Sequence, residues 1–332
     1  MKLTVIFAGC LLLEAGIFIL SLCQGTVFFP PGKVAHLLIQ APSTLDSFVL
    51  WTIRLPRALA TIFGGAILAV SGLLLQVYFR NPVVGPFVLG ISSGATLMVS
   101  LVMLTSISLS LPLLSPYITT AFAMLGALVV IGVVVAVSAR VKHAITLLIV
   151  GLMVGYLCHS VTAILMAFAE KQQIKGFVLW QLGSFSGFKW DEIKLLTGLG
   201  TALLLVAFTL SKPLNALLLG EDYALSMGLD IRRIRTILLF CACSMAGLIT
   251  ALAGPVAFIG LAVPHLARLL FSTSDNRLLI PGVMILGGLI TSGCDLVARF
   301  ILAPVELPLS AITAIFGAPL VISLLAKRQV KL

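Results

Sequence analysis

Residues 144–169 read AITLLIVGLMVGYLCHSVTAILMAFA, a stretch without any aspartate, glutamate, lysine or arginine. A backbone that crosses hydrocarbon must pair its amide groups internally, which leaves only an α-helix or a closed β-barrel. The stretch is far longer than the roughly ten-residue alternating strands of a barrel. It therefore predicts a membrane-spanning helix. Nine further runs along the chain are also long and mainly apolar.

The fold class predicted from these runs is an all-α membrane protein, a polytopic bundle of ten transmembrane helices. The predicted spans are 3–22, 55–79, 86–109, 117–139, 144–169, 193–211, 236–253, 256–271, 279–298 and 308–326. The connection from Cys23 to Trp51 contains three prolines, so we expect an ordered, turn-rich crossing there and no span.

Composition supports one membrane-embedded unit. Of 332 residues, 60% are hydrophobic and 10% charged, and the mean hydropathy is +1.21. An ordinary soluble domain has about half apolar and about a quarter charged residues, so a water-soluble enzyme is excluded. No segment is polar enough for a separate soluble domain. Residues 1–332 are therefore predicted to form a single transmembrane domain.

The net charge of +10 indicates topology and not nucleic-acid binding, because the basic residues fall between the apolar runs. With the N-terminus in the cytoplasm, most of them lie inside. The inner set is Lys2, Arg80, Arg140, Lys142, Lys212, Arg232, Arg233, Arg235, Arg268, Arg277, Lys327, Arg328 and Lys331. The outer set is smaller: Lys33, Arg54, Arg57, Lys171, Lys175, Lys189, Lys194 and Arg299. Both termini are thus predicted to be cytoplasmic.

Residues 212–235, KPLNALLLGEDYALSMGLDIRRIR, differ from the spans because they combine apolar residues at helical spacing with the acids Glu221 and Asp222. The pattern predicts two short helices at the inner membrane surface, with a break at Gly228. One interpretation is an amphipathic segment that rests on lipid headgroups. The other is a surface for a protein partner.

Motifs for catalysis are missing. The chain has no G-x-x-x-x-G-K-[ST] loop, H-E-x-x-H or G-x-S-x-G motif, and its six cysteines include no C-x-x-C pair. We predict no catalytic residue, metal site or cofactor. Among the aspartate, glutamate, lysine and arginine residues of the spans, Glu14 is the one far from a span end, which gives little support to an ion-coupled carrier. Gly151 and Gly155, at G-x-x-x-G spacing, predict close helix packing or a place along a translocation path.

Several stretches, in order along nearly the whole chain, resemble the FecCD family of ABC importer permeases. They are Arg54-Leu55-Pro56-Arg57, Arg80-Asn81-Pro82 with Pro86 and Leu89-Gly90, Trp180-x-x-Gly183-Ser184, Gly220-Glu221 with Met227-Gly228, Gly254-Pro255-x-x-Phe258-Ile259-Gly260-Leu261-x-x-Pro264-His265-x-x-Arg268, Asp295-x-x-x-Arg299, Glu306-Leu307-Pro308 and Gly317-Ala318-Pro319. Two positions depart from the pattern: Gly85 replaces a common acid and Met227 a usual leucine.

The resemblance implies a type II importer fold and an assembly. Two permease copies, with a homodimer expected, would enclose the path, beside two copies of an ATP-binding cassette ATPase and a periplasmic or lipid-anchored substrate-binding protein. It assigns Arg54, Arg57 and Arg299, which have few acids near them in sequence, to salt bridges with the binding protein; the alternative is that they reach lipid phosphates. It assigns residues 213–230 to ATPase contact, with Leu217, Gly220, Glu221, Met227 and Gly228 as the coupling residues.

The function implied is a permease subunit without enzymatic activity in the cytoplasmic (inner) membrane, driven by ATP hydrolysis in a separate subunit. The resemblance favours an iron–siderophore complex as cargo, with haem and cobalamin as alternatives. Composition alone would also allow a stand-alone secondary transporter powered by an ion gradient.

Overall fold

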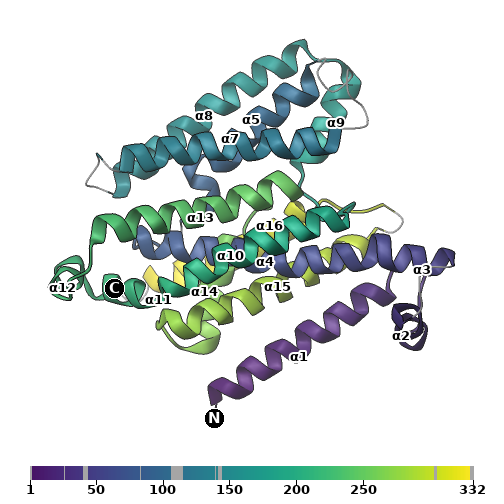
Figure 1. Ribbon diagram of the computed structural model, residues 1–332, viewed down its shortest axis with the longest axis horizontal. Coiled ribbons are helices and arrows are strands. Elements are labelled where there is room, and N and C mark those ends of the chain that lie inside the picture. Colours follow the sequence, from purple (N-terminus) through teal and green to yellow (C-terminus); the bar gives the residue numbers. More distant parts are fainter. Residues whose placement is uncertain are drawn as a thin grey trace.

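The computed structural model describes residues 2–25, 27–39, 44–82, 84–105, 115–138, 140, 144–302 and 305–329, and within them every regular element is a helix. In chain order these are α1 (Lys2–Cys23), α2 (Pro31–Ile39), α3 (Leu45–Val49), η1 (Leu50–Arg54), α4 (Leu55–Tyr78), η2 (Pro86–Leu89), α5 (Ile91–Leu104), α7 (Ser115–Ser138), α8 (Ala144–Phe168), α9 (Lys171–Gln181), α10 (Trp190–Thr209), α11 (Ser211–Leu219), α12 (Glu221–Ser226), α13 (Ile231–Ala253), α14 (Ile259–Phe271), α15 (Asn276–Phe300) and α16 (Leu309–Gln329) (Figure 1).

The all-helical fold class is confirmed, and each predicted span contains a helix. Among the described residues, seven helices are long and apolar enough to cross a membrane, while α5, α14 and the apolar part of α16 are shorter. Helix length and composition alone thus support seven of the ten predicted spans, and the count of ten is approximate. The end of the predicted span 86–109 lies outside the described residues, as do Lys142 and Lys331 of the predicted inner set.

In the connection from Cys23 to Trp51, the described residues are largely helical, because α2 and α3 occupy them, so the expected turn-rich character is wrong there. The Trp51 indole N–H donates to the Leu37 carbonyl at 3.1 Å and ties α2 to η1. The helix predicted to begin at Leu55 also extends back through η1 to Leu45. Arg54 therefore lies within a continuous helix and not before its start.

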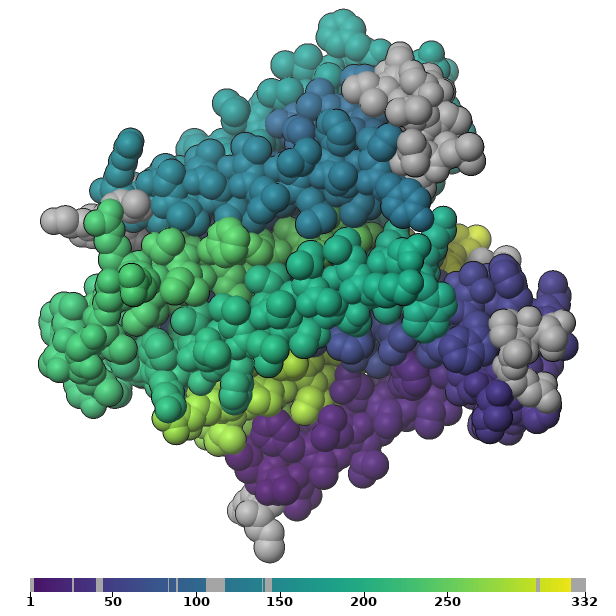
Figure 2. Space-filling model, in the orientation of Figure 1, coloured from purple at the N-terminus to yellow at the C-terminus, as the bar shows by residue number. Residues whose placement is uncertain are grey.

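The bundle has two parts with α4 at its centre. α5, α7, α8 and α9 lie together on one side, where α7 packs against α13 (Figure 1). α4, α10, α13, α14 and α15 form the larger part, with α1 against the outer face of α15. α1 runs along the edge of the molecule with most of its apolar side chains on the surface (Figure 2). Such an apolar exterior is suited to lipid and not to water.

Glycines allow the central helices to touch backbone to backbone. A Cβ at Gly65 on α4 would clash with the carbonyl oxygen of Gly287 on α15, and a Cβ at Gly72 would clash with the carbonyl of Gly260 on α14. Van der Waals packing between closely approaching helices is the main source of helix association in a bilayer. α4 thus packs directly against both α15 and α14 through backbone contacts.

This contact predicts that Gly72→Ala destabilises the folded permease by about 3 kcal/mol or more, because the added methyl group meets backbone that cannot rotate away. Gly132→Ala on α7 is the control, since a Cβ there meets nothing within 4 Å. Thermal unfolding in detergent can be followed with a thiol-reactive fluorophore, because all six cysteines are buried. A melting temperature for Gly72→Ala equal to that of the control would contradict the packing.

Candidate functional site

Five charged side chains meet at the end of the bundle that holds α2 and α3; we call them the arginine cluster. They are Arg54, Arg57, Asp295, Arg299 and Glu306. The Arg57 guanidinium from the start of α4 donates to both oxygens of Asp295 on α15, at 2.9–3.2 Å. Its Nη1 also donates to Glu306 at 2.8 and 3.0 Å. The side chains of Arg57 and Asp295 are 9% and 2% exposed, so this pair is sealed inside the protein.

The other two arginines complete the cluster from either side. Arg299 lies one helical turn after Asp295, with its Nη2 3.0 Å from Asp295 Oδ2 and 2.7 Å from the Ser21 hydroxyl on α1. Arg54 donates to the carbonyl oxygens of Leu22 and Cys23 at 2.8 and 3.0 Å. The three guanidinium groups therefore join α1, α4 and α15 at one end.

Few acids lie near these arginines in sequence, but the fold brings two to Arg57: Asp295 and Glu306 are distant from it in sequence and adjacent in space. Arg54 and Arg57 are also buried, so they turn into the protein and not toward lipid phosphates. Three guanidinium groups and two carboxylates leave the cluster with one net positive charge. Glu306, whose side chain is 45% exposed, is its most accessible carboxylate.

At the opposite end of the bundle, the segment 213–230 forms two short helices as predicted, α11 and α12. The break between them falls at Gly220, with φ of +131°, and a second turn follows α12 at Gly228, with φ of +77°. The predicted break at Gly228 is thus present, but Gly220 is what separates the helices. Both φ values are left-handed conformations that glycine adopts without a Cβ penalty.

The coupling residues predicted from sequence divide into an exposed and a buried group. Met227 is 59% exposed and stands with further apolar side chains on the surface, whereas Leu217 is 6% exposed and packs inward. Glu221 is held by Arg235 at 2.6 Å and lies 3.5 Å from Arg80. The surface apolar patch of this segment is Leu218, Leu219, Tyr223, Leu225 and Met227.

A clasp that the sequence did not reveal fixes α11 to α15. The Asn215 amide donates to Asp275 at 2.5 Å, and its oxygen accepts from the backbone and side-chain nitrogens of Asn276 at 2.8 Å. Hydrogen bonds from the Arg277 backbone and Asn215 lower the pKa of Asp275 below its ordinary value. The only sequence signal was the helix-capping pattern Asp275-Asn276 before an apolar run, which says nothing of Asn215.

Gly151 and Gly155 lie where α8 meets the start of α5. A Cβ on Gly90 would lie 2.6 Å from the Gly151 oxygen and 3.0 Å from the Gly155 nitrogen. The close packing predicted for the two glycines is thus present, and a cavity opens beside them. Across the described residues, no group of three or more histidine, cysteine, aspartate or glutamate side chains could hold a metal ion.

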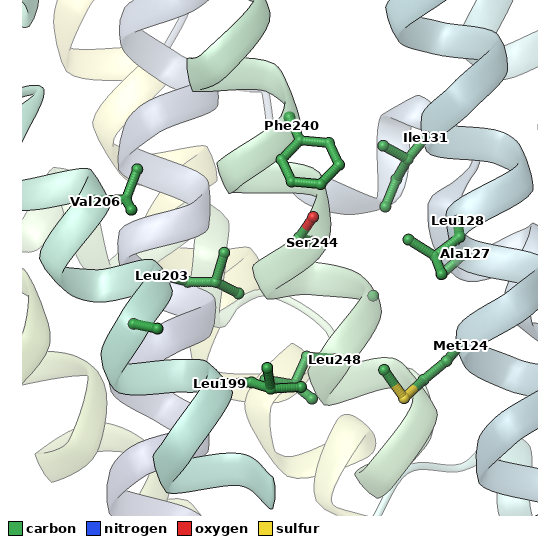
Figure 3. A pocket seen from close by; sticks show the side chains of 12 residues that line it. Met124, Ala127, Leu128, Ile131, Leu199, Leu203, Val206, Phe240, Ser244 and Leu248 are labelled. Atoms are coloured by element: carbon green, nitrogen blue, oxygen red, sulfur yellow. The ribbon is translucent and has the colours of Figure 1, made fainter.

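A second cavity of about 290 Å³ lies between α7, α10 and α13 (Figure 3). Leucine, valine, alanine, isoleucine, phenylalanine, methionine and glycine residues line it, and Ser244 is the one polar side chain on its wall. Within the described part of the chain, the Ser244 hydroxyl has no hydrogen-bond partner. With a single hydroxyl group and no charge, this cavity offers no chemistry for a reaction.

Comparisons with known proteins give one consistent result. Residues 11–327 match the FecCD transport family. The vitamin B12 import system permease protein BtuC of Klebsiella pneumoniae subsp. pneumoniae is 34% identical over 321 residues, covering 97% of this chain and 93% of that protein. BtuC of Salmonella typhi is 34% identical over 309 residues, covering 93% and 91%. A solved structure of an inward-facing transporter, described as of the metal-chelate ABC type, superposes with a TM-score of 0.86 at 27% identity, covering 98% and 99% of the two chains.

The geometry of the arginine cluster predicts unequal effects for its two carboxylates. Asp295→Asn leaves two buried guanidinium groups undercompensated and should destabilise the protein by about 3–5 kcal/mol. Glu306→Gln alters a half-exposed pair and should cost about 1 kcal/mol or less. Thermal unfolding of the two variants in the same detergent compares them. Equal melting temperatures would mean that Asp295 is not the centre of the cluster.

Proposed function

Because this chain belongs to the FecCD transport family and is a multi-pass inner-membrane permease of an ABC importer, we propose that it moves a metal chelate into the cell, driven by ATP hydrolysis in a separate subunit. The observation that carries the proposal is the superposition of 98% of the chain on a metal-chelate type ABC transporter. A ferric siderophore is the cargo proposed first, with haem and cobalamin as alternatives; the BtuC relatives support cobalamin.

The proposed assembly has two copies of this chain, two ATPase subunits and one substrate-binding protein. Residues 1–332 act as one transmembrane domain with both termini in the cytoplasm. This orientation places α11 and α12 on the cytoplasmic side, where the ATPase resides, and the arginine cluster on the outer side.

Two observations support α11 and α12 as the ATPase contact. The patch from Leu218 to Met227 exposes five large apolar side chains at one end of the bundle, which suits docking of a short helix into a partner's groove. Glu221 and its two arginines hold this segment against the ends of α4 and α13. Motion of the ATPase would therefore reach both long helices through Leu217, Gly220, Glu221, Met227 and Gly228.

The arginine cluster is the proposed contact for the binding protein. Arg54, Arg57 and Arg299 have partners within the protein. The cluster as a whole keeps one net positive charge, which attracts an acidic surface of the binding protein. Glu306 lies at its accessible edge. Such charge complementarity steers a partner and sets its orientation more than it adds affinity. On docking, an acidic residue of the binding protein would replace Glu306 as a partner of Arg57, or bind Arg57 in addition to it.

ATP dependence tests the proposed function directly. Proteoliposomes containing the permease, its ATPase and the cargo-loaded binding protein should accumulate radiolabelled ferrichrome, haem or cyanocobalamin only when hydrolysable ATP is supplied on the cytoplasmic face. Dissipating ion gradients with ionophores should leave uptake unchanged. Uptake that continues without ATP and stops with ionophores would show the stand-alone secondary transporter instead.

The turn at Gly228 predicts a coupling variant. Valine must adopt a φ near +77° there at a strain of about 1.4 kcal/mol or more, enough for about a tenfold shift in a conformational equilibrium. Gly228→Val should lower uptake about tenfold while basal ATP hydrolysis by the complex persists. Gly228→Asn is the control, because asparagine tolerates the left-handed region; both substitutions have open space around them. Normal uptake in the valine variant would count against coupling at this turn.

The net charge of the arginine cluster predicts how capture of the binding protein responds to salt. Glu306→Gln removes one negative charge yet keeps an acceptor for Arg57, so it should tighten capture and steepen its salt dependence, since exposed charges are screened over about 10 Å at 0.1 M ionic strength. Capture of the loaded binding protein by wild type and variant, at low and high salt, measures this. Identical capture in all four conditions would remove the cluster from the docking surface.

A further inference from the structure

The apolar cavity between α7, α10 and α13 lies at the junction of the two parts of the bundle. α7 belongs to one part, and α10 and α13 belong to the other (Figure 1). Figure 3 shows Ser244 of α13 at the centre of the wall, with Leu203 of α10 on one side and Leu128 of α7 on the other. All three helices are long and apolar enough to span the membrane, so the cavity lies within the bilayer.

The cavity is open to the surface of the bundle. At its rim, Leu128 is 47% exposed and Phe240 50%, whereas Ile131, which also lines it, is buried. Its floor is closed where α7 meets α13, because a Cβ on Gly247 would stand 2.8 Å from the Ala127 Cβ. The opening therefore faces the hydrocarbon layer, and a molecule can enter from the side.

Neither water nor empty space suits this cavity. A buried water needs about two to four polar partners, and the wall offers one hydroxyl group, on Ser244. That hydroxyl can rotate onto the carbonyl of Phe240, four residues earlier, so it does not require a polar ligand. An empty space of about 290 Å³ would deprive the wall of van der Waals contacts. The cavity is thus suited to an apolar, flexible molecule.

A basic residue lies on α13 in line with the cavity. Arg233, Phe240 and Ser244 are separated by seven and then four residues, so they share one face of the helix. Thr236 and Ile237 are exposed between Arg233 and Phe240. Arg233 lies about 10 Å before Phe240 and about 16 Å before Ser244 along the helix axis. Because the hydrocarbon of one leaflet is about 15 Å thick, Arg233 at the headgroup level places Ser244 near the middle of the membrane.

Further basic side chains are exposed at this end of the bundle, which also holds α11 and α12. Arg140 follows α7, Lys212 lies in α11 directly after α10, and Arg232 precedes Arg233. Asp230, the acid nearest to them on α13, accepts a hydrogen bond from the backbone N–H of Arg233 as the N-cap of this helix. All three helices of the cavity thus end near exposed positive charge, which complements the phosphate group of a lipid.

We propose that this cavity is a phospholipid-binding site. One acyl chain lies in the cavity, along α13 and between α7 and α10, and the phosphate group contacts Arg233. A chain that extends from a phosphate at this level reaches Ser244 within the thickness of one leaflet. The lipid fills the junction between the two parts of the bundle. The site requires only a membrane-embedded chain and no particular cargo, so it goes beyond the proposed function.

Lipid retention tests the acyl-chain contact. Native mass spectrometry of the full-length permease, washed in detergent after addition of palmitoyl-oleoyl phosphatidylglycerol, should show one lipid bound per chain. Ser244→Phe places a ring in the cavity and should lower retention about tenfold or more, because about ten lost carbon–carbon contacts are enough for that loss. Ser244→Ala keeps the space open and is the matched control. Ala202→Leu fills the cavity from an exposed position on α10 and decides the test if Ser244→Phe does not fold.

The headgroup contact has its own variant. Arg233→Gln should lower retention of the same lipid about fivefold, the effect of one arginine near an anionic lipid surface. Arg277→Gln removes the same charge from an exposed position on α15, which does not line the cavity, and should leave retention unchanged. Equal retention in the two variants would remove Arg233 from the site.

Photolabelling locates the acyl chain. Phosphatidylglycerol with a diazirine near the end of one acyl chain is added to phosphatidylcholine proteoliposomes that contain the permease, and the sample is irradiated. We expect labelling at Leu203, Phe240 or Leu248, which line the cavity, and loss of the label with excess unlabelled phosphatidylglycerol. Ser244→Phe should abolish this labelling, whereas Ser244→Ala should keep it.

Two results would overturn the lipid site. Equal retention and labelling in wild type, Ser244→Phe and Ala202→Leu would mean that lipid only surrounds the bundle. Disulfide formation between two copies of Leu128→Cys, with no lipid retained by wild type, would assign the cavity to a contact between copies. Neither measurement involves ATP or cargo, so a failure of the proposed function would be seen separately, in the uptake experiment.

Discussion

The direct backbone contact between α4 and α15 is the interaction that holds the bundle in its arrangement. It exists because Gly65 and Gly287 present no Cβ at the crossing, so that each carbonyl lies where a side chain would otherwise stand. In hydrocarbon the hydrophobic effect does not drive helices together, and close packing has to do so. At this separation Arg57 reaches Asp295 and forms a buried, multiply hydrogen-bonded pair.

The buried charges at the arginine cluster define the arrangement of helices more than they stabilise it. Removing charges from water costs several kcal/mol each, and mutual attraction recovers this only with good geometry. Arg57 and Asp295 meet the requirement, and Arg299 and Ser21 extend the network to α1. A bundle with another register would leave these charges unpaired, so the network selects one packing of α1, α4 and α15.

The α4–α15 pair also links the two ends of the molecule that the proposed function joins. At one end it carries the arginine cluster; at the other, Asn215 clasps the start of α15 and Glu221 lies between Arg80 and Arg235. Both helices therefore have polar contacts to neighbouring segments at each end. The part formed by α5, α7 and α8 joins them through α13 (Figure 1).

Neighbouring residues were enough to establish the helical class, the positions of the spans, the two short helices of 213–230 and the family, because apolar run length and local motifs are properties of contiguous sequence. They could not place Asp295 and Glu306 against Arg57, Asn215 against Asp275, or Gly151 and Gly155 beside Gly90. Nor did they show that the helix of Arg54 begins at Leu45, since proline-rich composition there favoured turns. Those features depend on which helices pack against each other. Glycine contacts and buried charge pairs between residues far apart in the chain determine that packing. Only the folded bundle shows this packing. In a bilayer, lipid solvates every apolar helix face equally well, so a specific packing contact is needed to favour one face over the others.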